Sequence, residues 1–183
     1  MNNITLQDTI VRLVREYEPM SYLEIGCYDG RSLRWVVENA AWLQRVCVCD
    51  TWDGPECRAA GFSDHSHIDQ MLDGLGCNAV RRYLDGQSHD LLPSEVDEYL
   101  YDLILVDGDH SEMAAFVDLL ICWKLLMPGG WLVMDDTNHV DHPYLDLVAQ
   151  RFHQTVRGEV WEAFDVASPP NPPCGHVAWR KRL

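Results

Sequence analysis

The chain has 183 residues, a length typical of one domain, and 47% of them are hydrophobic, which is enough to bury a substantial core. Its 14 Lys and Arg against 29 Asp and Glu give a net charge of -15, which argues against nucleic-acid partners and against docking on anionic membranes. The seven cysteines have no repeated spacing and indicate a reducing, cytoplasmic setting rather than a disulfide framework. Residues 1–17 do not resemble a signal peptide, and no apolar run is long enough to span a membrane.

Apolar residues recur at helical spacing in some segments and run together in others, so helices and strands alternate along the chain. Leu6, Ile10 and Leu13 define the opening helix, for example. In chain order we predict a helix over 5–17, a strand over 22–26, a helix over 31–41, a strand over 45–50, a loop or lid over 51–68, a helix near 67–75, a strand near 79–84, a strand over 101–107, a helix over 111–126, a strand over 131–135, a helix over 142–154, and two strands over 159–166 and 176–182 joined by a Pro-rich loop over 168–173.

This order predicts an α/β fold with one domain over residues 1–183. We expect a Rossmann-like, doubly wound, mainly parallel sheet with a C-terminal antiparallel strand pair. Ligands of such sheets bind at the carboxyl ends of the strands, near the point where the strand order reverses.

Each strong strand ends in an acid or a glycine. Because the carboxyl ends of parallel strands meet at one edge, these groups are expected to gather in one crevice. The alternative is that acids cap the helices that follow, which we prefer for Asp109 and Asp141 but not for acids that directly follow a buried run. The strand-end groups are Glu24, Gly26, Asp50, Asp107, Asp135 and Asp136.

The turn after the first strand distinguishes between cofactors. A dinucleotide fingerprint that starts at Gly26 requires glycines at 28 and 31, where Tyr28 and Arg31 stand instead, so NAD and FAD are disfavoured. A glycine turn with an acid just upstream suits a cationic ligand without phosphate, such as S-adenosylmethionine (SAM). Asp50 follows at a distance that suits an acid holding ribose hydroxyls.

Four segments resemble class I SAM-dependent methyltransferases in order and spacing. They are YLEIGCYDGRS (22–32), VCDTWDG (48–54), LDGQSHDLLPSEVDEYLYDLILVDGDHS (84–111) and LLMPGGWLVMDD (125–136). The likeness covers about residues 20–137. It is greatest to a subgroup with D-G-D-H and D-D strand ends, which includes metal-dependent sugar O-methyltransferases of natural-product pathways.

The resemblance implies that SAM is the cofactor. Glu24, Gly26 and Gly30 would shape its methionine end, Asp50 would hold the ribose, and Trp52 would lie beside the adenosine. Tyr28 departs from the wider class, in which many members carry glycine. The predicted cofactor-binding residues are Glu24, Gly26, Tyr28, Gly30, Asp50, Thr51, Trp52, Gln87, Ser88 and Asp107.

The resemblance also implies a divalent cation on Asp107, Asp135 and Asp136. Three carboxylates suit Mg²⁺, with Mn²⁺ or Ca²⁺ as alternatives. Asp107 and His110 are the predicted catalytic residues, with neutral His110 as the general base for a substrate hydroxyl. The alternative that His110 only packs against the start of the 111–126 helix stays open.

The leading hypothesis is therefore metal-assisted O-methylation of a small hydroxylated molecule or sugar. A non-catalytic SAM-binding or assembly subunit is the alternative from another class. The expected partner is a small-molecule acceptor, with no nucleic acid and no membrane, and a homo-oligomer is allowed for. The acceptor itself is not indicated, because specificity in this class depends on lids and insertions.

Overall fold

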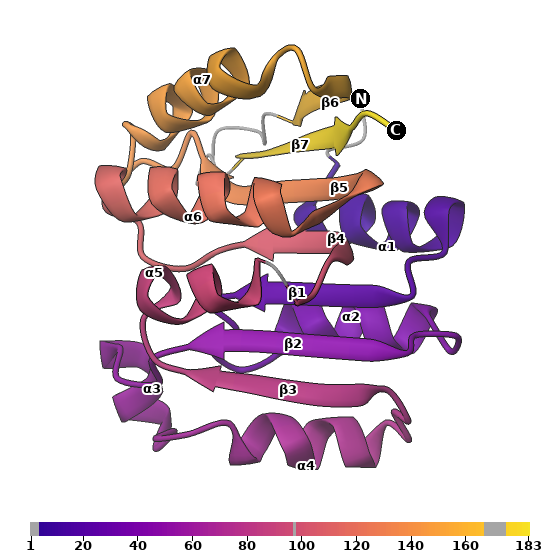
Figure 1. The fold of residues 1–183 in the computed structure, drawn as a ribbon. Helices are drawn as coiled ribbons and strands as arrows, with labels where there is room; N and C mark the ends of the chain where they lie inside the picture. Colours follow the sequence, from indigo (N-terminus) through magenta and orange to yellow (C-terminus); the bar gives the residue numbers. More distant parts are fainter. Residues whose placement is uncertain (1–3, 97, 167–174) are drawn as a thin grey trace.

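The described residues form one seven-stranded sheet in the order β3-β2-β1-β4-β5-β7-β6 (Figure 1). The structure is a computed structural model and describes residues 4–96, 98–166 and 175–183. The strands are β1 (Ser21–Ile25), β2 (Arg45–Asp50), β3 (Val80–Asp85), β4 (Tyr101–Val106), β5 (Leu126–Thr137), β6 (Val160–Val166) and β7 (Gly175–Lys181). The helices are α1 (Leu6–Tyr17), α2 (Arg31–Asn39), α3 (Pro55–Ala60), α4 (Ser66–Gly74), α5 (Ser88–Leu91), the 3₁₀ helix η1 (Leu92–Glu95), α6 (Glu112–Leu125) and α7 (Leu145–Val156).

The strands β3, β2, β1, β4 and β5 are parallel to one another, and β7 runs antiparallel to its neighbours β5 and β6. The chain runs outward from β1 to β3 and then returns to β4 on the other side of β1, so the strand order reverses between β1 and β4. This reversal opens a crevice at the carboxyl ends of those two strands. The predicted Rossmann-like α/β fold with a terminal antiparallel pair is confirmed.

Helices cover both faces of the sheet, and the sheet divides the core in two. Leu23 and Ile25 of β1 face the layer of α6 and α7, whereas Tyr22 faces the layer of α1, α2 and α4. All five residues of β1 are buried, including the polar Ser21 and Glu24, as expected for a central parallel strand covered on both faces. Cys47 and Cys49 of β2 are buried in the core, and the six described cysteines are free.

Three predictions about elements are wrong or incomplete. The segment 51–68 is not an irregular lid, because it contains α3 and the start of α4. The residues between β3 and β4, for which no helix was predicted, form α5 and η1. Strand β5 begins at Leu126, five residues earlier than expected, because Leu126 already pairs with Tyr101 before the glycine turn. The Pro-rich loop 168–173 lies outside the described residues.

A buried hydrogen bond joins the first helix to the last strand. Thr9 Oγ1 of α1 lies 2.7 Å from His176 Nε2 of β7, and both residues are about 1% exposed. Burial, together with nearby Arg12, lowers the pKa of His176 to about 4. Within the described residues, no helix is both long enough and apolar enough to cross a membrane.

The depressed pKa of His176 predicts a loss of stability in mild acid. The unfolded state takes up a proton near pH 6.5 whereas the folded state does so only near pH 4, so stability present above pH 6.5 is lost as the pH falls toward 4. Urea unfolding at pH 7.5 and pH 5 should show about 2 kcal/mol more destabilisation in the wild type than in His176→Gln. Equal pH dependence in the two proteins would contradict this linkage.

Candidate functional site

A cavity of about 630 Å³ lies at the carboxyl ends of β1, β2, β4 and β5. This volume is in the range of small-molecule sites, and the position is the crevice that the strand order predicts. The lining residues fall into four groups: the glycine turn after β1, the segment after β2, the turn after β3, and the ends of β4 and β5. They are Ile25, Gly26, Tyr28, Cys49, Asp50, Thr51, Asp53, Gly54, Pro55, Glu56, Cys57, Gly86, Gln87, Ser88, Asp107, Gly108, Asp109, His110 and Asp136.

Gly26 lets the ends of β1 and β4 touch. Its φ is +79°, and a Cβ at this position would lie 2.0 Å from the carbonyl oxygen of Asp107. Backbone hydrogen bonds of 2.9 Å from Gly26 N–H to Cys49 and from Asp107 N–H to Ile25 fix the same junction. Only glycine satisfies both the left-handed backbone and the absence of space.

The carboxylate of Asp50 organises the two turns beside this junction. Its Oδ2 accepts a hydrogen bond from the backbone N–H of Tyr28, and its Oδ1 accepts one from that of Trp52, both at 2.9 Å. Tyr28 and Trp52 have φ values of +46° and +56°, which are costly for residues with a side chain. The bonds to Asp50 support both strained turns, and each oxygen keeps a lone pair for a ligand hydroxyl.

One wall of the cavity comes from the segment predicted to be a loop or lid. Asp53, Gly54, Pro55, Glu56 and Cys57 line the cavity from the start of α3. The signal for this helix was present, since Gly54-Pro55 places proline at the first helical position, but the helix is too short for apolar periodicity to reveal it.

Contacts of His67 and Phe62 with Tyr28 hold the segment after α3 against the glycine turn. His67 Nε2 lies 2.6 Å from the carbonyl oxygen of Tyr28, and the His67 ring stacks on Phe62 with centroids 3.7 Å apart. Tyr28 in turn contacts Phe62, with their centroids 5.9 Å apart. The segment after α3 is therefore packed in place against the turn that carries Tyr28, which lines the cavity.

Three side chains that can each offer a ligand atom to a metal ion converge at the rim of the cavity. His110 Nε2 lies 2.9 Å from Asp136 Oδ2 and 3.6 Å from Asp107 Oδ1. One ligand atom from each of these residues lies within 4.8 Å of the other two, which is close enough to hold one metal ion. Asp135, the third predicted metal ligand, does not belong to this group among the described residues.

The carboxylates and the imidazole alter one another's protonation. Burial raises the pKa of Asp107, and the neighbouring Asp136 raises it further. Burial and the adjacent Asp107 and Asp136 also raise the pKa of Asp135 well above its ordinary value. The carboxylates of Asp107 and Asp136 raise the pKa of His110 to about 10, so without a cation the imidazole is protonated at neutral pH.

A family model described as a methyltransferase domain matches residues 23–137. This span covers more than half of the chain and contains the glycine turn, Asp50, Asp107 and the two acids near the end of β5. The chain belongs to this methyltransferase family. A curated relative, an uncharacterised protein of Acanthamoeba polyphaga mimivirus, is 23% identical over 130 residues, which are 66% of this chain and 53% of that protein. The match thus spans about half the length of that relative.

Solved methyltransferases share the fold. The O-methyltransferase TomG from Streptomyces achromogenes, in complex with SAM, is 18% identical with a TM-score of 0.68, over 96% of this chain and 79% of that one. The N-methyltransferase NodS from Bradyrhizobium japonicum WM9 is 16% identical with a TM-score of 0.63, over 97% and 94% of the two chains. The same architecture therefore occurs in proteins named for oxygen and for nitrogen acceptors.

Most of the predicted cofactor residues of the methyltransferase line the cavity, and three do not. Glu24 is fully buried beneath it, where Tyr22 and Ser32 donate hydrogen bonds to its carboxylate, and burial raises its pKa to about 8. The residues that do line the cavity are Gly26, Tyr28, Asp50, Thr51, Gln87, Ser88 and Asp107.

Gly30 and Trp52 serve the packing around the site. A Cβ on Gly30 would come within 2.9 Å of side-chain atoms of Ile68 and Met71, so this glycine admits α4. The Trp52 side chain is buried, and its Nε1 donates a hydrogen bond of 2.8 Å to Asp85. Trp52 thus contributes to the site through its backbone N–H on Asp50.

Two histidines that follow β5 join His110 at the rim in a row of stacked rings. The ring of His142 stacks on that of His110 with centroids 4.6 Å apart, and His139 stacks on His142 at 5.4 Å. Their distance from His110 in sequence gave no signal of this contact.

The close approach at Gly26 predicts a large loss of stability on substitution. Gly61 has nearly the same φ, +78°, but nothing lies within 4 Å of an added Cβ, so it is a matched control. In urea unfolding, Gly61→Ala should lose about 1–2 kcal/mol from backbone strain alone. Gly26→Ala should lose at least about 3 kcal/mol or fail to fold, because the clash adds to the strain. Similar losses for the two variants would show that the contact with Asp107 is unimportant.

Proposed function

We propose that this methyltransferase transfers the methyl group of SAM to a hydroxyl of a small acceptor, with a divalent cation at Asp107 and Asp136. The observation that carries the proposal is the convergence of these two carboxylates and His110 at the rim of the cavity. The cofactor, the cation and the oxygen acceptor each have separate support.

The charge of the cavity favours a cationic ligand. No Lys or Arg is among its described lining residues, and His110 is the one basic side chain there. SAM carries a sulfonium and an ammonium group and would be attracted, whereas a pyrophosphate would be repelled. The acids that line the cavity are Asp50, Asp53, Glu56, Asp107, Asp109 and Asp136.

The ligand atoms at the rim suit a divalent cation. Oxygen and imidazole ligands within 4.8 Å of one another fit Mn²⁺, and the carboxylates alone fit Mg²⁺. A bound cation would act as a Lewis acid that lowers the pKa of an acceptor hydroxyl and orients its oxygen. Asp107 and Asp136 would hold it.

His110 has two candidate roles that exclude each other at any moment. Its Nε2 points to both carboxylates, so it is placed either to bind the cation or to receive the acceptor's proton. The raised pKa means that the imidazole becomes a base only when its interaction with the carboxylates is weakened. A cation bound to the carboxylates of Asp107 and Asp136 would weaken this interaction.

Oxygen is the acceptor atom that this rim favours. A hydroxyl is a weak nucleophile until its proton leaves, and the carboxylates with His110 provide the means to remove it. A neutral amine needs no such activation.

Cofactor binding should depend on Asp50. Calorimetric titration should show SAM binding to the wild type, no NAD binding, and at least a tenfold weaker SAM affinity in Asp50→Asn, because the amide replaces an acceptor of two backbone N–H groups and of the ribose hydroxyls. Glu38→Gln, an exposed acid on α2 paired with Arg34, should bind SAM normally. Unchanged SAM affinity in Asp50→Asn would contradict the assignment of this cavity.

Metal binding should separate the two roles of His110. In titrations with Mg²⁺ and Mn²⁺, Asp136→Asn should weaken both cations at least tenfold, whereas Asp141→Asn, an exposed acid of the following loop, should not. If His110 is a ligand, His110→Gln loses the preference for Mn²⁺ over Mg²⁺. If it is the base, metal affinity stays the same and turnover falls about 100-fold.

Turnover decides between an enzyme and a non-catalytic subunit. SAM consumption with a panel of hydroxylated acceptors should require a divalent cation and fall after exhaustive chelation. SAM binding without turnover of any acceptor would favour the non-catalytic alternative, and turnover that survives chelation would exclude the metal.

A further inference from the structure

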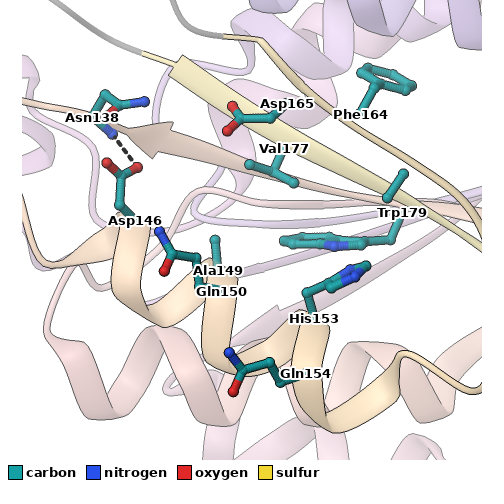
Figure 2. Close-up of a pocket in the computed structure, with 11 residues that line it drawn as sticks. Asn138, Asp146, Ala149, Gln150, His153, Gln154, Phe164, Asp165, Val177 and Trp179 are labelled. Carbon is teal, nitrogen blue, oxygen red and sulfur yellow. Dashed lines mark hydrogen bonds between the residues drawn. The ribbon is translucent and has the colours of Figure 1, made fainter.

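A second cavity of about 400 Å³ lies between α7 and the β6–β7 ribbon (Figure 2). We call it the α7 groove. Its walls come from α7 on one side and from β6 and β7 on the other, and Asn138 closes the end next to β5. Figure 1 shows α7 alongside this ribbon at the edge of the sheet. The volume is sufficient for a small organic group.

The α7 groove combines an apolar floor with a polar rim. Trp179 and Val177 face it from β7, and the strand register places Ala163 and Asp165 of β6 opposite them on the same face. Along α7, Asp146 and Gln154 are separated by about 12 Å at 1.5 Å per residue. An apolar floor with few polar groups is the usual composition of a small-molecule site.

The charge of the groove is negative. Asp146 projects from the first turn of α7 and Asp165 from β6, and no Lys or Arg is among the described residues that line the groove. His153 is the one other titratable lining residue. Burial raises the pKa of Asp165, and the charge of Asp146 adds to this effect. A ligand with a positive charge would relieve the repulsion between the two carboxylates.

The groove begins next to the rim of the cofactor cavity. Asp136 lines the first cavity and Asn138 lines the groove, so at most about 7 Å of chain separates their Cα atoms. Both residues have left-handed backbones, with φ of +57° and +60°, which makes the chain between them shorter still. The backbone N–H of Asn138 donates a hydrogen bond of 3.0 Å to Asp146, which anchors this turn to α7.

We propose that the α7 groove binds the part of the acceptor that is not methylated, and that this part is a compact ring bearing a protonated amine. The ring would lie over Val177 and Ala163, and the ammonium would lie between Asp146 and Asp165. The identification of the ligand as the acceptor rests on the proposed function. The preference of the groove for a cationic ring does not depend on it.

The binding preference can be tested without SAM or metal. The probes are cyclohexylmethylamine and cyclohexylmethanol, which have nearly the same shape and differ in charge at neutral pH. Their binding is followed by NMR through the side-chain amide signals of Asn138, Gln150 and Gln154, which line the groove. The amine should shift these signals and bind about fivefold more tightly than the alcohol, the gain of a partly exposed ion pair.

Two variants on one strand provide the control. Asp165→Asn should remove the preference for the amine. Glu162→Gln changes the same charge, but register places residue 162 on the opposite face of β6, so it should keep the preference. Equal affinity for amine and alcohol, shifts confined to signals outside the groove, or a preference that survives Asp165→Asn would each overturn the proposal.

The link to catalysis has a separate readout. Among hydroxylated acceptors that are turned over, those with an amine should have the lower KM, and Asp165→Asn should raise that KM about fivefold with little change in kcat. If KM is insensitive to both the amine and Asp165, the groove does not hold the acceptor, whatever the NMR result. Failure of every acceptor would count against the proposed function and would leave the NMR test of the groove intact.

Discussion

The contact between the backbones of Gly26 and Asp107 is the constraint on which the site depends. It brings the carboxyl ends of β1 and β4 together at the point where the strand order reverses. The turn after β1 can then present Tyr28 N–H to Asp50, and Asp107 is held at the edge next to the end of β5. A side chain at position 26 would separate these ends, and the cavity and its acidic rim would no longer share one edge.

The fold could be predicted from the sequence because its signals are local. The run at Tyr101–Val106 and the acids after each strand indicated both the central strands and the edge at which ligands bind. The α3 helix was missed because six residues are fewer than two helical turns and show no periodicity. The indole of Trp52 was assigned beside adenosine from a resemblance, but its direction is decided by a left-handed backbone and a hydrogen bond to Asp85. His142 reaches His110 through a turn that no spacing rule describes.

Backbone strain is concentrated around the two cavities. Four of the five non-glycine residues with positive φ among those described lie at or just beyond the carboxyl ends of β1, β2 and β5, and these are Tyr28, Trp52, Asp136 and Asn138. Such conformations persist only where surrounding bonds support them, and here Asp50 and Asp146 accept the backbone N–H groups of three of the four. The acids near the site thus have a structural role in addition to any role toward ligands, which is why substitutions there need a measure of stability beside any measure of binding.

The position of β7 between β5 and β6 has a consequence for biosynthesis. Residues 175–181 are made after every other strand, yet β6 has no sheet partner except β7 among the described residues, and β5 needs β7 on its outer side. During translation the nascent chain therefore carries an open edge on β5 and an unpaired β6 until this last segment leaves the ribosome. Open strand edges promote association between chains, so this interval is the one in which a chaperone would be of most use to the protein.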